Sequence, residues 1–334
     1  MSLRATLTRG ALAAFCHGGL VGPIARAVAF TRRMPRVPIL TLHRVNDDND
    51  PFMPSLPTAV FAARMAHIAR HYRVLTVEEL AARLQDGRVP WNALGVTFDD
   101  GYRDNLTHAA PILKRLGLPA TIFLVTGHID TQHALWFDRL AMAFKTTTAR
   151  RVALGDEQPL SLGTVGERLA ALNVALRYLK RLPDDRRSAS VEELLFALRS
   201  NSDCPKRLML SWNEVDALRG FGFSIGAHTV THPILSRLSP DNAWDEIHGS
   251  KAAIEKALGD PVRAFAYPNG GPNDYNETVT RLVHEAGFSC AVTTRRGMND
   301  ADTPVLELRR GGPSEHHLPT FAAKLVYYSA TGGV

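Results

Sequence analysis

Short apolar runs alternate with stretches of helical periodicity along most of the chain. The apolar runs are typical of buried strands and cover 37–43, 72–76, 93–98, 120–125, 223–227, 264–267 and 291–294. The periodic stretches predict helices at 58–71, 77–84, 105–116, 212–218, 243–258 and 277–286. Because strands and helices alternate at the intervals of parallel βαβ units, the pattern predicts an α/β fold built on a parallel sheet.

One stretch, 129–207, departs from this alternation. Its periodicity predicts helices at 136–144, 165–181 and 190–198. We interpret it as a helical subdomain inserted into the α/β fold. The expected organisation is a basic leader helix at 1–36, α/β parts at 37–128 and 208–312, the insertion at 129–207, and a C-terminal tail at 313–334.

The composition is that of an ordinary globular protein, with 45% hydrophobic and 22% charged residues in 334. Its three cysteines are widely spaced, which excludes a disulfide framework and weakly favours a reducing compartment. The apolar segment 11–30 makes a poor membrane span because it is broken by His17, Pro23 and Arg26. No export signal is evident, so we expect the protein in the cytoplasm or on the cytoplasmic face of the membrane.

The net charge is +6, and part of the excess lies in arginines near the N-terminus. A solvated basic leader is one explanation, and contact with an anionic membrane face or a phosphate-bearing lipid carrier is the other. Nucleic acid is disfavoured as a partner because no basic stretch is interleaved with stacking aromatics. Nothing in the sequence indicates the oligomeric state.

Polar side chains follow two of the predicted strands. Asp99 and Asp100 end one of them, and Gly101 permits the turn that lets neighbouring carboxylates share a site. His228 and His232 follow another strand, and their spacing predicts that both lie on one face of a short helical turn. Because catalytic residues of parallel α/β folds gather at the carboxyl ends of strands, we expect these groups to meet.

One carboxylate together with His228 and His232 forms a mixed oxygen and nitrogen ligand set. Such a set leaves positions for water and substrate, as a catalytic metal centre requires. Zinc suits these donors best, with cobalt, nickel and manganese as alternatives. With the second carboxylate free to act as a base, the residues predict metal-assisted hydrolysis.

Three segments together resemble the motifs of the polysaccharide deacetylase (NodB-homology) family, carbohydrate esterase family four. They are Thr97-Phe98-Asp99-Asp100-Gly101, His228-Thr229-x-x-His232 and Arg263-x-Phe265-x-Tyr267-Pro268-x-Gly270. The likeness covers about 37–127 and 208–312. It implies a distorted (β/α) barrel of about seven parallel strands, interrupted here by the helical insertion. It also implies hydrolysis of N-acetyl groups, or in some members O-acetyl or N-formyl groups, on sugars.

The resemblance also implies roles for individual residues. Asp99 would be the general base, and Asp100 would bind the metal with the two histidines. Arg263 would pair with Asp99 and keep it ionised, unless it is a surface cation. Tyr267 and Pro268 would line the sugar groove, and the Tyr267 backbone N–H is the expected oxyanion donor. The alternative for Tyr267 is a core aromatic.

The general acid departs from the common family pattern, because 305–310 contains no counterpart of the usual Leu-x-x-His motif. The strand that ends in His43 resembles the N-terminal strand and histidine of the permuted deacetylases that act on exported poly-N-acetylglucosamine. We therefore expect His43 to be the general acid. His316 and His317 are the alternatives, and His43 could instead cap a core strand.

The sequence thus predicts a metal-dependent amide hydrolase that removes N-acetyl groups from sugars of a polysaccharide or glycolipid. Deformylation or deacetylation of a lipid-linked sugar is an alternative that the basic leader favours. A non-catalytic carbohydrate-binding module is another, although a binder has no need of Asp99 and Arg263. In the insertion, Trp136, Phe137 and Asp138 are candidates for lining the groove, with core packing as the alternative for the two aromatics.

Overall fold

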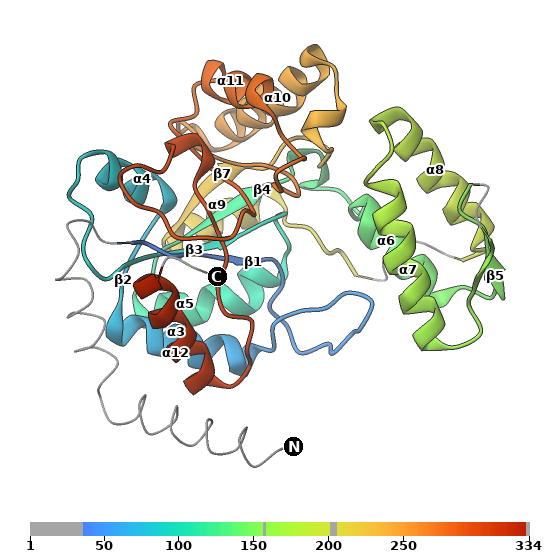
Figure 1. Ribbon diagram of the computed structural model, residues 1–334, viewed down its shortest axis with the longest axis horizontal. Helices are drawn as coiled ribbons and strands as arrows, with labels where there is room; N and C mark the ends of the chain where they lie inside the picture. The colour runs from blue at the N-terminus through green and yellow to red at the C-terminus, as the bar shows by residue number, and fades with distance from the viewer. Residues whose placement is uncertain (1–35, 156–157, 201–205, 332–334) are drawn as a thin grey trace.

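The computed structural model describes residues 36–155, 158–200 and 206–331 (Figure 1). The leader helix expected at 1–36 therefore lies, except for its last residue, outside the described residues. Among the helices that are described, none is long and apolar enough to cross a membrane.

A parallel sheet forms the centre of the molecule and has seven strands within the described residues. They are β1 (Ile39–Leu42), β2 (Arg73–Leu75), β3 (Ala93–Phe98), β4 (Ala120–Leu124), β7 (Phe223–Ala227), β8 (Ala264–Ala266) and β9 (Cys290–Val292). Their order is β1-β3-β4-β7-β8-β9, and β2 pairs with the first half of β3. The sheet curls into a half-barrel flanked by helices, so the predicted α/β fold with about seven parallel strands is confirmed (Figure 1).

An irregular segment lies between the two ends of this strand order. Leu308 accepts a hydrogen bond from the Thr293 N–H at 2.8 Å beside β9. Three residues later, the Gly311 N–H donates to Ile39 of β1 at 2.9 Å. Residues 308–311 therefore join β9 to β1 and complete the ring around the interior, which brings Arg310 into the barrel.

The helices predicted around the sheet are confirmed. They are α3 (Thr58–His71), α4 (Val77–Gln85), α5 (Ala110–Leu116), α9 (Trp212–Gly220), α10 (Pro240–Leu258) and α11 (Glu277–Glu285). At the start of α4, Thr76 and Glu79 form a capping box. The predicted helix at 105–116 begins with a π-helical stretch, Asn105–Ala109, before α5.

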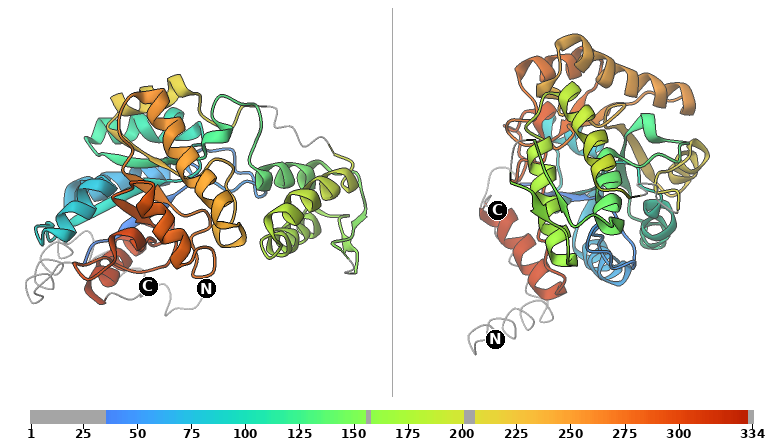
Figure 2. Two further views of the ribbon diagram at one scale, coloured as in Figure 1. Left: turned by 90° about the horizontal axis from the view of Figure 1, so that it is seen from above. Right: turned by 90° about the vertical axis from the view of Figure 1, so that its right-hand side faces the viewer.

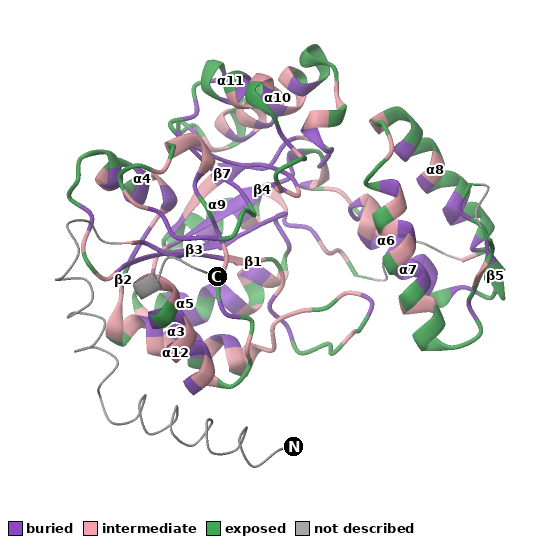
Figure 3. Ribbon diagram, viewed as in Figure 1, coloured by how far each residue is buried: buried purple, intermediate pink, exposed green. Residues whose placement is uncertain are grey.

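The main apolar core fills the space between the sheet and these helices (Figure 3). Phe98 of β3 packs edge-on against Phe61 of α3, with ring centroids 6.0 Å apart, and lies 5.7 Å from Phe223 of β7. Burying each such ring stabilises the fold by about 1.5–3 kcal/mol. This packing fixes the strands whose ends carry the candidate site.

The insertion forms its own layer beside the half-barrel (Figure 1 and Figure 2). Its helices are α6 (Trp136–Thr146), α7 (Val165–Leu179) and α8 (Asp184–Ala197), close to the three predicted. They share a separate apolar core that includes Leu140, Phe144, Leu172, Leu179 and Leu194. A hairpin of β5 (Arg151–Val152) and β6 (Leu160–Ser161) was not predicted, because two-residue strands are too short to show a periodicity.

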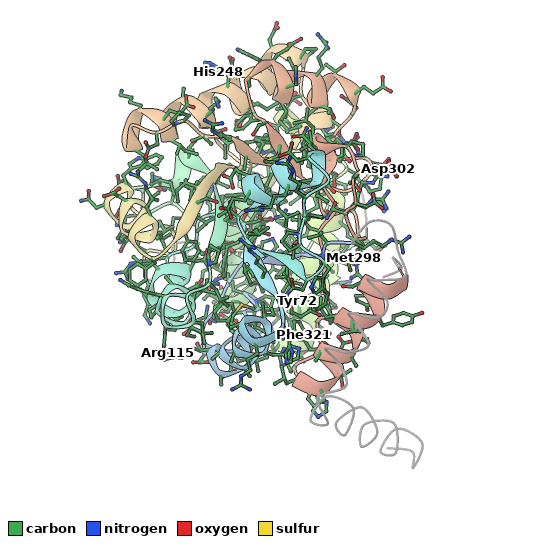
Figure 4. All side chains as sticks on the ribbon, turned by 90° about the vertical axis from the view of Figure 1, so that its left-hand side faces the viewer. Tyr72, Arg115, His248, Met298, Asp302 and Phe321 are labelled. Carbon is green, nitrogen blue, oxygen red and sulfur yellow. The ribbon has the colours of Figure 1, made fainter. Side chains whose placement is uncertain are left out.

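The segment expected to be a tail contains a helix, α12 (Leu318–Thr331), that packs on α3. Phe321 of this helix is buried (Figure 4). The Arg64 guanidinium of α3 lies 4.7 Å from the centroid of the Phe321 ring. Arg64 also donates to the carbonyls of Ser314 and Glu315. The C-terminal region is thereby anchored on the barrel.

Candidate active site

The two aspartates lie where β3 ends and the chain reverses. Asp100 has a φ of 75° and Gly101 a φ of 84°, so two successive residues adopt the left-handed conformation. This conformation is strained for a residue with a side chain, and Asp100 therefore shares the turn that the sequence assigned to Gly101 alone. As a result Asp99 and Asp100 are both buried, each 2% exposed.

Asp99 is held by a buried arginine that the sequence did not predict. Arg310 donates two hydrogen bonds to its carboxylate, at 2.6 and 2.7 Å. The guanidinium is fixed in turn by the Thr293 carbonyl at 2.9 Å and the Thr97 hydroxyl at 3.0 Å. Burial alone would raise the pKa of Asp99, but Arg310 outweighs it and holds that pKa well below its usual range. Asp99 is therefore an ionised carboxylate in a fixed orientation.

The pairing of Arg263 with Asp99 was wrong. Arg263 is exposed and directly precedes β8, whereas Asp99 directly follows β3. Because the strands of this sheet are parallel, the start of one and the end of another lie at opposite ends of the barrel. Arg310 reaches Asp99 from the segment that joins β9 to β1. The only sign of it in the sequence was its place in 305–310, where a family motif was expected.

Asp100, His228 and His232 come together as a buried group. Asp100 Oδ1 lies 3.5 Å from Nε2 of each histidine and, although buried, has no hydrogen-bond partner among the described residues. Two ligand atoms bound about 2.1 Å from one tetrahedral ion lie about 3.4 Å apart. The spacing and the unpaired oxygen therefore fit a divalent metal better than they fit direct hydrogen bonds.

The electrostatics of this group also favour a cation. Burial, and then the charge of Asp99, raise the pKa of Asp100 well above its usual value. Burial lowers the pKa of His228 to about 4 and that of His232 well below its usual value, so both rings are neutral at pH 7. His228 Nδ1 lies 2.7 Å from the Ala266 carbonyl, which fixes Nδ1 as the donor and leaves Nε2 free to act as a ligand.

The histidines lie on a bent loop, so the predicted helical turn was wrong. Thr229 has a φ of 67° and His232 a φ of 62°, both in the left-handed region. Glu246 of α10 holds the loop by accepting a hydrogen bond from the Val230 N–H at 2.8 Å. Gly127 lets it pack closely, because a Cβ there would lie 2.7 Å from the Val230 carbonyl oxygen. Neighbouring elements thus support the conformation that turns both rings inward.

His43 directly follows β1 and faces Asp99. Its Nε2 lies 3.9 Å from Asp99 Oδ2, and 52% of its side chain is exposed. Asn105 supports it by donating to the His43 carbonyl at 2.8 Å. Exclusion of water by the surrounding protein, followed by the Arg310 charge, lowers the pKa of His43, and Asp99 opposes that shift. The alternatives lie elsewhere, because His316 lines a neighbouring pocket and His317 lies 2.9 Å from the Thr320 hydroxyl.

The roles expected for Tyr267 were wrong. Its ring is fully buried and stacks on Tyr275 at 4.4 Å, and its backbone N–H donates to Val292 at 3.1 Å within the sheet. It is a core aromatic and cannot also be the oxyanion donor. Pro268 is buried too, and the described residue of this segment that lines the cavity is Asn269. Asn269 has a φ of 57° and a buried Nδ2 with no hydrogen-bond partner in the described part of the chain.

A cavity of about 410 Å³ lies between the half-barrel and the insertion and contains this site. The half-barrel lines it with His43, Arg44, Asp99, Asp100, Tyr102, His228, His232, Asn269 and Thr294. The insertion and the loop after β1 line it with Phe52, Met53, Pro54, Phe137, Asp138, Ala141, Leu172, Leu176 and Lys180. The cavity is therefore polar on the barrel side and largely apolar on the other.

The family model described as polysaccharide deacetylase matches residues 86–291 of this chain, which is more than half of its length. The protein therefore belongs to the polysaccharide deacetylase family. Bacillus subtilis YxkH, named as a polysaccharide deacetylase, is 23% identical over 282 residues, which cover 84% of this chain and 72% of YxkH. A poly-β-1,6-N-acetyl-D-glucosamine N-deacetylase of Staphylococcus aureus is 29% identical over 80 residues, covering 24% of this chain and 28% of that enzyme.

Solved structures of deacetylases share the fold. Streptococcus pyogenes PplD, in complex with acetate, has a TM-score of 0.60 at 21% identity and covers 87% of this chain and 99% of its own. IcaB from Ammonifex degensii has a TM-score of 0.57 at 19% identity, and the match covers 87% of this chain and 97% of IcaB. At these identities the likeness establishes the fold alone.

Proposed function

We propose that this protein is a metal-dependent amide hydrolase that removes N-acetyl groups from N-acetylated sugars of a polysaccharide or glycolipid. The observation that carries the proposal is the pairing of an ionised carboxylate, Asp99, with the neighbouring group of Asp100, His228 and His232. One carboxylate is neutralised by Arg310 and the other faces two neutral imidazoles, so a base and a ligand set stand side by side. The activity named for the staphylococcal relative supports this substrate class.

The metal would be held by Asp100, His228 and His232, which fit a divalent ion by their spacing and by the unpaired Asp100 oxygen. Zinc suits one carboxylate and two imidazoles best, and cobalt, nickel and manganese accept the same donors. When bound, such an ion supplies polarisation of the acyl oxygen and a lower pKa for water.

The remaining chemistry belongs to the protein's own residues. Asp99, kept ionised by Arg310, accepts a proton from the water that attacks the amide carbon. His43, whose Nε2 lies 3.9 Å from Asp99, donates a proton to the sugar nitrogen as the carbon–nitrogen bond breaks. The lowered pKa of His43 makes its protonated ring a stronger acid. One water is consumed, the proton taken up by Asp99 returns to His43, and the acid proton of the released acetic acid passes to the amine, so the products are acetate and a sugar ammonium.

The test is release of acetate and amine from N-acetylglucosamine oligomers by protein loaded with zinc or cobalt. Asp99→Asn is expected to lower kcat at least about 10³-fold while metal content stays unchanged, because the base is not a ligand. His228→Ala is expected to lose both activity and metal. A folded, metal-loaded protein that turns over no acylated sugar would contradict the proposal.

A second candidate, deformylation or deacetylation of a lipid-linked sugar, is favoured by the apolar wall of the cavity. Met53, Leu172 and Leu176 form part of that wall and suit a hydrocarbon chain. The basic leader suits an anionic membrane, which would place the protein on the cytoplasmic membrane face. Deleting residues 1–33 should then weaken association with anionic liposomes, and unchanged binding would remove this candidate.

A further inference from the structure

Asp138, in the first turn of α6, brings a carboxylate from the insertion into the catalytic cavity. It is only 5% exposed, and the Tyr102 hydroxyl donates to its Oδ2 at 2.8 Å. Tyr102 lies two residues after Asp100, so this hydrogen bond fixes Asp138 relative to the catalytic loop. The insertion is thereby held in register with the residues that would carry out the reaction.

One oxygen of the Asp138 carboxylate, Oδ1, remains available as a hydrogen-bond acceptor. It accepts no hydrogen bond from any residue that the structure describes and, unlike Asp100 Oδ1, is not a fully buried unpaired atom, so it is accessible from the cavity. An accessible acceptor in such a cavity is satisfied by water, which a hydroxyl donor of a ligand can replace. Asp138 is thus a poor choice for a purely structural link, because a neutral acceptor would hold Tyr102 at a lower cost in desolvation.

Phe137 presents an aromatic ring next to this carboxylate. It lines the same cavity and packs edge-on against His232, with ring centroids 5.3 Å apart. An aromatic ring beside a fixed carboxylate matches a sugar, which has an apolar face of C–H groups and a rim of hydroxyl donors. The contact with His232 places this surface beside the group that would hold the metal.

We propose that Asp138 and Phe137 form the subsite that recognises the sugar ring bearing the hydrolysed amide. Asp138 accepts a hydrogen bond from a ring hydroxyl, and Phe137 contacts the apolar face of the ring. The inference rests on the proposed function and deepens it, because it assigns selection of the sugar to the helical insertion.

The experiment compares two substrates of the metal-loaded full chain. N-acetylglucosamine tetramer has ring hydroxyls, and 4-nitrophenyl acetate has none. Asp138→Asn is expected to lower kcat/KM for the tetramer about 10–100-fold and to leave that for the aryl ester within about twofold. The amide oxygen of asparagine still accepts from Tyr102, so the variant should fold. Phe137→Leu is expected to lower the tetramer value about tenfold in the same selective way.

The matched control is Arg139→Gln, at the residue next to Asp138. Arg139 pairs with Glu192 of α8, at 2.7 and 3.0 Å, so its loss perturbs α6 without touching the cavity lining. Both activities should stay within about twofold of the wild type. Equal losses on both substrates in Asp138→Asn would mean that the residue only supports the structure, and would overturn the inference.

Direct binding separates failure of this inference from failure of the proposed function. In Asp99→Asn protein, the tryptophan fluorescence, to which Trp136 next to Phe137 contributes, should respond to the tetramer, and adding Asp138→Asn should raise the Kd at least about tenfold. If the wild type turns over no tetramer but this binding difference is seen, the proposed function fails and the subsite stands. An unchanged Kd, or no tetramer binding at all, overturns the subsite.

Discussion

The two walls of the cavity are built in different ways. On the half-barrel wall, acidic side chains and imidazoles follow strand ends, and Asp99 among them is fixed by two hydrogen bonds from Arg310, which Thr97 and Thr293 hold in turn. On the insertion wall, apolar side chains of α6 and α7 dominate, and Asp138 and Lys180 are the charged residues described there. The insertion also has an apolar core separate from that of the barrel.

This difference indicates that the two walls of the cavity have different roles. The barrel wall holds the groups suited to hydrolysis, and their geometry depends on the sheet. The insertion wall depends on its own small core, so its surface could change during evolution without disturbing those groups. The comparison can be tested by damaging each wall separately.

The largest expected effect comes from the core of the insertion. Phe144→Ala removes a fully buried ring and should destabilise the insertion by about 3–5 kcal/mol, because a cavity of this kind seldom collapses. Limited proteolysis should then cut within 136–198 at lower temperature than in the wild type. Metal content should stay unchanged, and its loss would show that the two walls are not independent.

The next effect tests the arginine that holds Asp99. Arg310→Lys keeps the charge but loses the two parallel hydrogen bonds, and should lower kcat about 10²–10³-fold. Arg263→Gln serves as the control, since an exposed arginine at the opposite end of the barrel should change kcat less than about twofold. The reverse result would restore the pairing that the sequence predicted.

The effect of losing His43 on kcat should depend on how readily the leaving group departs without a proton. His43→Gln is expected to lower kcat on N-acetylated sugar about 10²-fold, because an amine leaves poorly without a proton. Hydrolysis of 4-nitrophenyl acetate should fall less than about threefold, since nitrophenolate leaves unprotonated. An equal loss on both substrates would remove His43 as the general acid.

The smallest effect is a pH dependence of stability. Burial raises the pKa of Asp138 from 3.8 to about 6, so between these values the folded protein binds more protons than the unfolded chain, and this residue's contribution to stability falls as pH rises. Asp138→Asn lacks this loss. Its free energy of unfolding relative to the wild type should therefore grow by about 1–2 kcal/mol from pH 4 to pH 7. Urea unfolding at both pH values measures it, and a difference that shrinks with pH would contradict the assignment.

Much of the fold could be predicted because it depends on local patterns. The apolar runs at 93–98 and 223–227 became β3 and β7 with the same bounds. Polar residues at the ends of parallel strands meet at one edge of the sheet. This rule predicted the grouping of Asp100, His228 and His232 that the structure shows. These features need only the periodicity of the chain and the direction of its strands.

The errors arose where geometry is set by long-range contacts. Arg310 lies on a segment without strand periodicity, 211 residues from Asp99, so nothing local marks it. Thr229 and His232 of the bent histidine loop adopt left-handed conformations. Neither residue is a glycine, so the sequence gives no sign of these conformations. Asn269 lines the cavity where Tyr267 was expected, two residues earlier in the sequence. A sequence motif alone does not show which of its residues faces the cavity.

The segment 308–311 also has a consequence for biosynthesis. A ribosome makes Asp99 early, but its counter-ion emerges some two hundred residues afterwards. A nascent or prematurely terminated chain would thus contain every strand of the sheet and the whole insertion while its acidic pair stayed unneutralised. The arrangement that keeps Asp99 ionised would accordingly form only after residue 310 has been made.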